Sequence, residues 1–264
     1  MKAIILAAGY ATRMYPLTEN QPKALLPLRG KPVIDYIVEQ IRRIPEVTEI
    51  FVVTNSKFYP HFCEWAAGAN MEAQKASAES ARQVSLEASE QAISPALRVE
   101  VLDDGTDSNE NRRGAVGDVF FTIQQKNIDD ELLIIASDNY FTYDLREQLA
   151  VFRKTGCDTL VAKEMHDREK IKAFGVAVLA PDGKLLDFEE KPQNPKSNTA
   201  VYAAYFYRRE TTPLFEKYLA EGHSPDNIGA FPQWLYKTHP VYVYIMNGDC
   251  HDIGTIEMYN EMNK

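Results

Sequence analysis

Residues 2–28 read KAIILAAGYATRMYPLTENQPKALLPL, and this stretch carries the strongest structural signal in the chain. Lys2–Leu6 is an apolar run, and the small residues Ala7, Ala8 and Gly9 follow it directly. A short apolar run of this kind is typical of a strand buried on both faces of a parallel sheet. The stretch therefore predicts a buried strand that leads into a loop of small residues.

Two cations, Arg13 and Lys23, follow within this loop. Small residues after a strand let backbone N–H groups approach a phosphate, and two cations on one loop can neutralise an anion with several charges. The loop lacks the glycine spacing of the Rossmann fingerprint and the lysine-serine or lysine-threonine pair of a Walker A motif. Taken alone, it is compatible with a triphosphate-binding loop and equally with a structural turn.

In the first half of the chain, apolar runs alternate with segments of helical periodicity. The runs predict strands at 49–54, 98–102 and 132–136, and the periodicity predicts helices over 33–44, from residue 58 onward and over 116–123. Strands that alternate with helices imply right-handed crossovers and a parallel sheet. Asp103 and Asp138 follow two of these runs, so we expect each carboxylate at the end of a strand.

Beyond residue 155 the pattern changes, and Asp182 with Gly183 is typical of a hairpin turn. The second half is therefore expected to add antiparallel strands to the sheet. We predict an α/β fold class, Rossmann-like, with a mostly parallel mixed sheet flanked by helices, and a single domain over residues 1–264. The strands predicted in this half are 159–162, 175–179, 184–188, 201–207 and 241–246.

Residues 66–92 differ in composition from the rest of the chain. They are rich in alanine, serine, glutamate and glutamine, and their large apolar residues are Met71, Val84 and Leu86. Alanine favours helix, but so few apolar side chains cannot bury much surface. We expect an exposed helical or partly disordered surface insertion at about 66–97, either tolerated on the surface or used to bind a partner.

The overall composition excludes several classes of protein. The 264 residues include 29 basic and 38 acidic side chains, and a net charge of −9 disfavours a protein that coats nucleic acid or an anionic membrane. No apolar run approaches the roughly 20 residues that span a bilayer. The three cysteines lie far apart and cannot form a disulfide framework, which favours a reducing, cytoplasmic location.

Five blocks of residues occur in a fixed order along the chain. The first is 8–27, with Arg13 and Lys23, and the others are Asp138-Asn139-Tyr140, Phe174-Gly175-Val176, Glu189-Glu190-Lys191-Pro192 and Asp252-Ile253-Gly254-Thr255. Together these blocks closely resemble the signatures of sugar-nucleotide pyrophosphorylases, especially glucose-1-phosphate thymidylyltransferases. The resemblance covers nearly the whole chain except residues 66–92.

The resemblance implies transfer of a nucleotidyl group to a sugar 1-phosphate, with release of pyrophosphate. Arg13 and Lys23 would hold the nucleotide phosphates, and Gly114 would let the base lie against the backbone. Ala11 stands where the family usually has glycine, and segment 103–118 differs from the usual thymidylyltransferase pattern, so the resemblance does not give the base. The residues implied to bind the nucleotide are Ala7, Ala8, Gly9, Arg13, Lys23 and Gly114.

Asp138 and Asp252 match the two magnesium carboxylates of the family, which makes Mg²⁺ the expected cofactor. Magnesium prefers hard oxygen ligands. Without Asp252, Asp138 would be interpreted as a turn residue or a helix cap. Cys250 and His251 beside Asp252 could suggest a softer metal, but adjacent strand residues point to opposite faces and no second Cys or His cluster exists, which disfavours zinc.

The resemblance also implies an acceptor site in the second half of the chain. Lys191 matches the lysine that holds the acceptor phosphate, and Glu190 the carboxylate that accepts hydrogen bonds from sugar hydroxyls. Gly175 fits a close backbone approach to the sugar, and Asn139 and Tyr205 are expected beside it, although Tyr205 could equally be a core residue. The residues expected to act in catalysis are Arg13, Lys23, Asp138 and Lys191.

The expected partners are a nucleoside triphosphate and a phosphorylated small molecule, for which the resemblance implies a sugar 1-phosphate. A homo-oligomer is compatible with the sequence. A cytidylyltransferase for a non-sugar phosphate such as phosphocholine would share the first loop, but Gly175 and the block around Lys191 favour a sugar. A catalytically silent regulator could bind a nucleotide sugar and contact a partner through residues 66–92. It would not need a complete set of site residues, and the chain retains Arg13, Lys23, Asp138, Lys191 and Asp252. A glycosyltransferase usually carries an aspartate-x-aspartate motif, which is not evident around Asp138.

Overall fold

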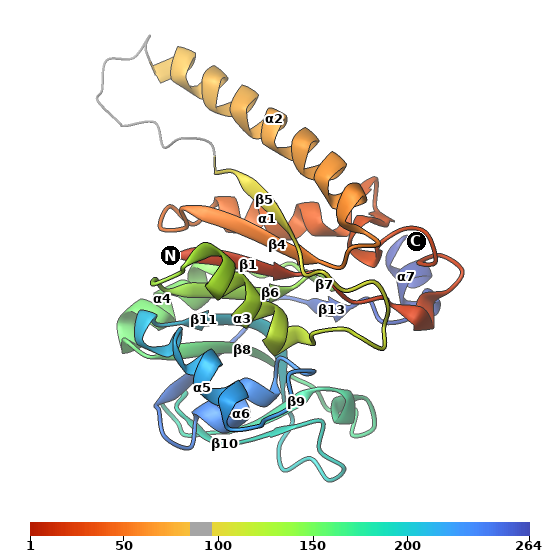
Figure 1. Cartoon of the computed structure of the whole chain (residues 1–264). Helices are drawn as coiled ribbons and strands as arrows, with labels where there is room; N and C mark the ends of the chain where they lie inside the picture. The colour runs from red at the N-terminus through yellow and green to blue at the C-terminus, as the bar shows by residue number, and fades with distance from the viewer. Residues whose placement is uncertain (85–96) are drawn as a thin grey trace.

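The first apolar run forms β1 (Lys2–Leu6), which lies between β4 (Glu49–Thr54) and β6 (Leu132–Ala136) and runs parallel to both. The structure is a computed structural model and describes residues 1–84 and 97–264 (Figure 1). Ile4 and Ile5 point to opposite faces of the sheet and both are fully buried. The prediction of a strand buried on both faces is confirmed.

The sheet has nine strands in the described part of the chain, in the order β10-β9-β11-β6-β1-β4-β5, and β8 joins it between β11 and β12. β1, β4, β5 and β6 are mutually parallel, whereas β11 runs antiparallel to β6, β8 and β9. This mixed α/β arrangement confirms the predicted fold class. The remaining strands of the sheet are β5 (Val99–Asp103), β8 (Asp158–Glu164), β9 (Gly175–Leu179), β10 (Leu185–Glu190), β11 (Thr199–Tyr207) and β12 (Val241–Ile245).

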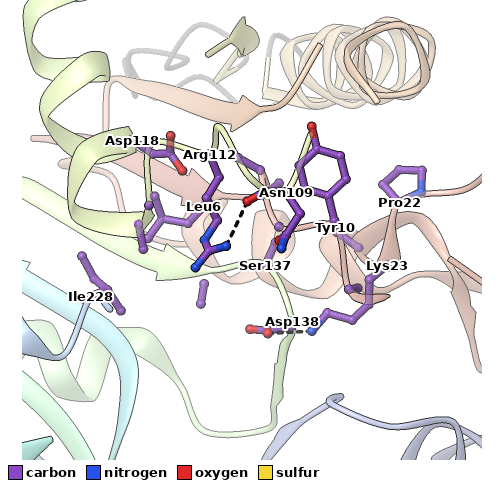
Figure 2. A pocket seen from close by; sticks show the side chains of 18 of the residues that line it. Leu6, Tyr10, Pro22, Lys23, Asn109, Arg112, Asp118, Ser137, Asp138 and Ile228 are labelled. Carbon is purple, nitrogen blue, oxygen red and sulfur yellow. Dashed lines mark hydrogen bonds and ion pairs between the residues drawn. The ribbon is translucent and has the colours of Figure 1, made fainter. Parts of the chain in front are cut away.

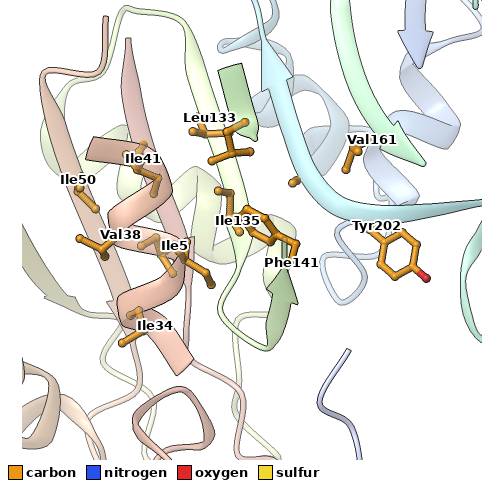
Figure 3. Close-up of a cluster of buried hydrophobic side chains, with 14 of the residues drawn as sticks. Ile5, Ile34, Val38, Ile41, Ile50, Leu133, Ile135, Phe141, Val161 and Tyr202 are labelled. Carbon is orange, nitrogen blue, oxygen red and sulfur yellow. The ribbon is translucent and has the colours of Figure 1, made fainter. Parts of the chain in front are cut away.

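Helices cover both faces of the sheet, and each face has its own hydrophobic cluster. One cluster joins Ile5 to α1 (Val33–Arg42), α2 (Tyr59–Val84) and α4 (Leu145–Thr155) (Figure 3). The other joins Ile4 to α3 (Ala115–Lys126), α5 (Leu214–Ala220) and α6 (Ala230–Leu235). Successive side chains of β1 point to opposite faces of the sheet, so this one strand contributes to both hydrophobic clusters.

A third, smaller cluster holds the first loop in place. Met14 and Leu26 pack there with Tyr140 and Ile253, and α7 (Ile256–Met262) covers them. The cluster therefore ties the loop to two short paired strands, β7 (Asn139–Phe141) and β13 (Cys250–Asp252). The other short elements are β2 (Pro27–Leu28), β3 (Lys31–Pro32) and the 3-10 turns Thr12–Met14, Lys23–Leu25, Lys170–Ala173 and Arg209–Thr211.

The expected insertion falls partly on α2, which continues from Tyr59 to Val84 without a break. The segment 85–96 lies outside the described residues. Met71 is 58% exposed, but Asn70 is docked: its side chain donates to the carbonyl of Val99 at 2.9 Å and accepts from the N–H of Val99 at 2.8 Å. Composition alone did not predict this contact. Among the described residues, no helix is long and apolar enough to cross a membrane.

Truncation of Phe231 in α6 tests the core on the α3 side of the sheet. Its ring is fully buried and stacks on Phe215, with ring centroids 3.8 Å apart. We expect Phe231→Ala to lower the free energy of unfolding by about 3–5 kcal/mol, measured by urea denaturation, because the cavity left behind cannot fully collapse. Leu186→Ala is the control, because Leu186 is 57% exposed and its loss should change stability by less than about 0.5 kcal/mol. Equal losses in the two variants would contradict this assignment of the core.

Candidate functional site

A continuous cavity lies where β1 and β6 end, as expected for an open α/β sheet. It has two adjoining parts, of about 430 Å³ and about 230 Å³. Both parts are bordered by Ala115, by Ala136 and Asp138 at the end of β6, and by residues 226–228 between α5 and α6. Asp138 therefore stands at the junction of the two parts.

The structure brings every site residue predicted from the sequence to this cavity. The larger part contains those expected to hold a nucleotide, and the smaller part those expected to hold an acceptor. The larger part is lined by Ala7, Ala8, Gly9, Arg13, Lys23, Gly114 and Asp138. The smaller part is lined by Asp138, Asn139, Gly175, Glu190, Lys191, Tyr205 and Asp252.

The first loop is held in a fixed shape by contacts outside its own backbone. Ala11 has φ 48° and ψ 42°, a left-handed conformation that glycine adopts most easily. The hydroxyl of Thr18 donates to the carbonyl of Ala11 at 2.8 Å, and the amide of Asn55 donates to the carbonyl of Ala8 at 2.9 Å. The loop therefore takes the turn that a glycine would allow, although alanine occupies the position.

Lys23 and Asp138 form an ion pair at the junction of the two parts, with Nζ 2.7 Å from Oδ2 (Figure 2). Burial would raise the pKa of Asp138, but the charge of Lys23 and its hydrogen bond outweigh this effect and lower the pKa. Asp138 is therefore held as a carboxylate, and Lys23 is held in the larger part of the cavity, beside the residue that borders both parts.

Asp252 lies beside this pair because β13 pairs with β7, with Asp252 opposite Asn139. The N–H of Ile253 donates to the carbonyl of Asp138 at 3.0 Å. Burial, followed by the charge of Asp138, raises the pKa of Asp252 to about 6. The Oδ1 atom of Asp252 is buried without a hydrogen-bond partner.

These two carboxyl groups fit a divalent cation with hard oxygen ligands. A cation would satisfy the unpartnered oxygen of Asp252 and offset its repulsion from Asp138. Within residues 1–84 and 97–264, no group of three or more His, Cys, Asp or Glu side chains could hold a metal ion. Water and substrate phosphate would therefore have to supply the remaining ligands, as is common for Mg²⁺.

In the smaller part of the cavity, two glycines make room for the carboxyl group of Glu190. A Cβ atom at Gly175 would collide with the ring of Phe188 and lie 3.1 Å from Glu190 Oε2, and a Cβ atom at Gly229 would collide with the same oxygen. The N–H of Glu190 donates to the side chain of Gln233 at 2.6 Å. Burial raises the pKa of Glu190, while the neighbouring Lys191 opposes this effect.

Lys191 is positioned by its backbone and by two neighbouring side chains. Its φ of 51° is left-handed, and its N–H donates to the carbonyl of Phe174 at 3.1 Å. Its Nζ atom donates to Oδ1 of Asn227 at 3.1 Å and lies 3.7 Å from Oε1 of Glu190. Asn227 also borders both parts of the cavity, so it connects Lys191 to the junction.

Two predicted acceptor residues also have structural contacts. The amide of Asn139 donates to the carbonyl of Ala203 at 3.4 Å. Tyr205 is 3% exposed and belongs to the α3-side core, but it also borders the cavity. The two interpretations of Tyr205 are therefore compatible with each other.

Gly114 starts α3 with φ 81°, and a Cβ atom there would lie 2.6 Å from the carbonyl oxygen of Pro225. The N–H groups of Ala115 and Val116 donate to the carbonyls of Asp226 and Pro225, at 3.1 and 2.8 Å. Gly114 is therefore required for close packing of α3 on the segment that borders both parts of the cavity.

A pair of buried carboxyl groups, which the sequence did not predict, lies behind the larger part of the cavity. Asp104 and Asp118 are 1% and 5% exposed, and Asp118 borders the cavity. Burial, then the charge of Asp104 and a hydrogen bond to it, raises the pKa of Asp118 to about 8. An aspartate within the apolar stripe of Val116 and Val119 was the signal that could have revealed it.

The pair gives the stability of the protein a distinct dependence on pH. Because the pKa of Asp118 is raised, the folded protein keeps a proton that the unfolded chain releases above about pH 4. The free energy of unfolding should therefore fall as the pH rises from about 4 to about 8. We expect this fall to be smaller in Asp118→Asn, measured by urea denaturation at about pH 5 and pH 8.

Asp182→Asn, which changes an exposed turn residue, is the matched control and should keep the pH dependence of the wild type. Identical pH dependence in the wild type and in Asp118→Asn would show that Asp118 does not retain a proton in the folded protein.

The chain is similar in sequence to a known family and to named proteins. The model of a family described as nucleotidyl transferase matches residues 2–264. A Sulfolobus acidocaldarius protein, provisionally named a mannose-1-phosphate guanyltransferase, is 28% identical over 268 residues, which cover 100% of this chain and 62% of that protein. The UTP–glucose-1-phosphate uridylyltransferase of a Synechocystis species is 27% identical over 267 residues, with coverage of 98% and 61%. The chain thus spans less than two thirds of the length of both relatives.

The fold is also found in solved structures. A crystal structure of a Bacillus anthracis protein, provisionally named a glucose-1-phosphate thymidylyltransferase, superposes with a TM-score of 0.71. It is 24% identical and covers 100% of this chain and 94% of its own. This similarity supports the mixed α/β fold described above.

Proposed function

The chain belongs to the nucleotidyl transferase family, and on that premise we propose that it joins a nucleoside triphosphate to a sugar 1-phosphate, giving a nucleotide sugar and pyrophosphate. One observation supports this most strongly. Arg13 and Lys23 line one part of a continuous cavity, Lys191 lines the other, and Asp138 borders both. Such an arrangement suits two phosphorylated substrates that must react with each other.

The reaction would begin when an oxygen of the acceptor phosphate attacks the α-phosphorus of the nucleotide in line with the leaving group. A new oxygen–phosphorus bond forms, the bond from the α-phosphorus to its bridging oxygen breaks, and pyrophosphate leaves with that electron pair. The acceptor phosphate is already ionised near pH 7, so no general base is needed. The main task of the protein is to hold two anions together in the correct orientation.

The cationic side chains would divide this task. Arg13 and Lys23 would neutralise the nucleotide phosphates, and Lys191 the acceptor phosphate. Asp138 and Asp252 would hold Mg²⁺, which when bound supplies further positive charge at the phosphates. Lys23 would also keep Asp138 ionised, because the two form an ion pair at 2.7 Å.

A sugar is favoured as the acceptor because of the surroundings of Glu190. Its half-buried carboxyl group lies against the backbones of Gly175 and Gly229 and can accept hydrogen bonds from hydroxyl groups. The direct test is a panel of nucleoside triphosphates crossed with sugar 1-phosphates and phosphocholine, assayed by pyrophosphate release. Release with a sugar 1-phosphate is expected, whereas release with phosphocholine alone would contradict a sugar acceptor.

Substitution of Lys23 or Asp138 tests the assignment of the reaction centre. We expect Lys23→Ala and Asp138→Asn each to lower kcat/KM for pyrophosphate release by about 100-fold or more, because each removes a group aligned with the phosphates. Lys217→Ala is the control, since Lys217 is exposed on α5 away from the cavity. Near-normal turnover in a folded Lys23→Ala or Asp138→Asn protein would refute the assignment.

Substitution of Lys191 tests the division between the two parts of the cavity. We expect Lys191→Ala to raise KM for the sugar phosphate by about 10-fold or more while KM for the nucleotide changes much less, because a charge-assisted contact to one substrate is lost. Steady-state kinetics with each substrate varied in turn separate the two constants. A larger rise in KM for the nucleotide than for the sugar phosphate would contradict the assignment of Lys191 to the acceptor.

A further inference from the structure

We propose that Asp118 selects the base of the nucleotide by presenting a hydrogen-bond acceptor to a base that carries an exocyclic amino group. Adenine, cytosine and guanine meet this requirement, and uracil and thymine do not. The inference rests on the proposed function, since it assumes that a nucleoside triphosphate occupies the larger part of the cavity. Family membership does not determine the base, because one relative is named for guanylyl transfer and another for uridylyl transfer.

Asp118 lies at the end of the larger cavity where a base would bind if the phosphates bind at Arg13 and Lys23. Arg13 and Lys23 would hold the phosphates, and Figure 2 shows Asp118 on the opposite side of the cavity from Lys23. Asp118 lies in the first turn of α3, and its N–H donates to the carbonyl of Gly114 at 2.8 Å. The conformation of Gly114 and its contact with Pro225 therefore fix where the carboxyl group lies.

Three buried polar atoms in or behind the wall of the larger part of the cavity lack hydrogen-bond partners in the described structure. They are the hydroxyl of Tyr10, Oδ2 of Asp104 and Oδ1 of Asp118. Tyr10 and Asp118 both border the cavity, and both are more than nine-tenths buried. Buried polar atoms without partners are costly, so each of these atoms requires a partner, either from a neighbouring side chain or from a ligand in the cavity.

Asp104 fixes the orientation of Asp118. The N–H and the hydroxyl of Thr106 both donate to Oδ1 of Asp104, each at 2.7 Å. Its Oδ2 atom and Oδ1 of Asp118 are both buried without a donor, so a single proton shared between the two carboxyl groups would satisfy both atoms. The raised pKa of Asp118 agrees with a proton retained at this position near neutral pH.

The shared proton determines what Asp118 offers to a ligand. Asp104 accepts hydrogen bonds from Thr106, would share the proton with Asp118 and does not border the cavity. The Oδ2 atom of Asp118 would then carry no proton and could only accept a hydrogen bond. An amino group would donate to this oxygen. Uracil and thymine have no amino group, and their one N–H is flanked on both sides by carbonyl oxygens. These oxygens would be repelled by the acceptor oxygen of Asp118, so the contact would be weaker than one with an amino group.

The experiment compares kcat/KM for ATP, GTP, CTP, UTP and dTTP with one sugar 1-phosphate, and measures binding of each nucleotide by calorimetry without acceptor. The best amino-bearing nucleotide should exceed both UTP and dTTP by about 10-fold or more. Asp118→Ala should reduce this ratio by about 10-fold, because the acceptor oxygen is lost.

Asp118→Asn is the matched variant. Its amide N–H can donate to Oδ2 of Asp104 in place of the shared proton, which leaves its carbonyl oxygen as the acceptor. It should therefore keep the wild-type ratio within about 3-fold. A structural role alone would make both variants lose activity with all five nucleotides equally.

Preference of the wild type for UTP or dTTP overturns the proposal, as does an unchanged ratio in a folded Asp118→Ala protein. If Asp118→Ala does not fold, the wild-type panel and Asp118→Asn still decide the question. Binding of nucleotides without turnover on any acceptor would count against the proposed function instead, and the calorimetric order of affinities would then test Asp118 independently.

Discussion

The ion pair between Lys23 and Asp138 is the contact on which the arrangement of the site depends. It joins a loop that follows β1 to the end of β6, across the two strands at the centre of the sheet. Each partner alone would be a partly buried charge, whose desolvation is costly. Together they keep a cation and a carboxylate at the point where the two parts of the cavity meet.

The segment 225–229 also connects the two parts of the site. It packs on Gly114 at the start of α3, supplies Asn227 to Lys191 and places Gly229 against Glu190. One short connection between α5 and α6 therefore touches residues proposed to serve the nucleotide and residues proposed to serve the acceptor. Its position depends in turn on the stacked rings of Phe215 and Phe231 beneath it.

Much of the fold could be predicted from the sequence because its elements are locally encoded. β1, β4, β6 and β9 begin and end where the apolar runs do, and Gly183 forms the expected hairpin turn. The residues that line the cavity were predicted from motifs that resemble those of a known family. Local hydrophobic patterns do not show which residues distant in sequence lie close together in the fold. Asp104 and Gly229 were missed because their importance comes from contacts distant in sequence, with Asp118 and Glu190.

The contact between Asn70 and Val99 has a consequence for how the molecule behaves among its own copies. Among the residues that the structure describes, β5 is the last strand at its end of the sheet, and the unpaired backbone groups of such a strand can template the addition of a strand from another molecule. The side-chain amide of Asn70 binds both the N–H and the carbonyl of Val99, as a neighbouring strand would. By occupying these groups, α2 protects the start of β5 from intermolecular β-pairing, the first step toward aggregation.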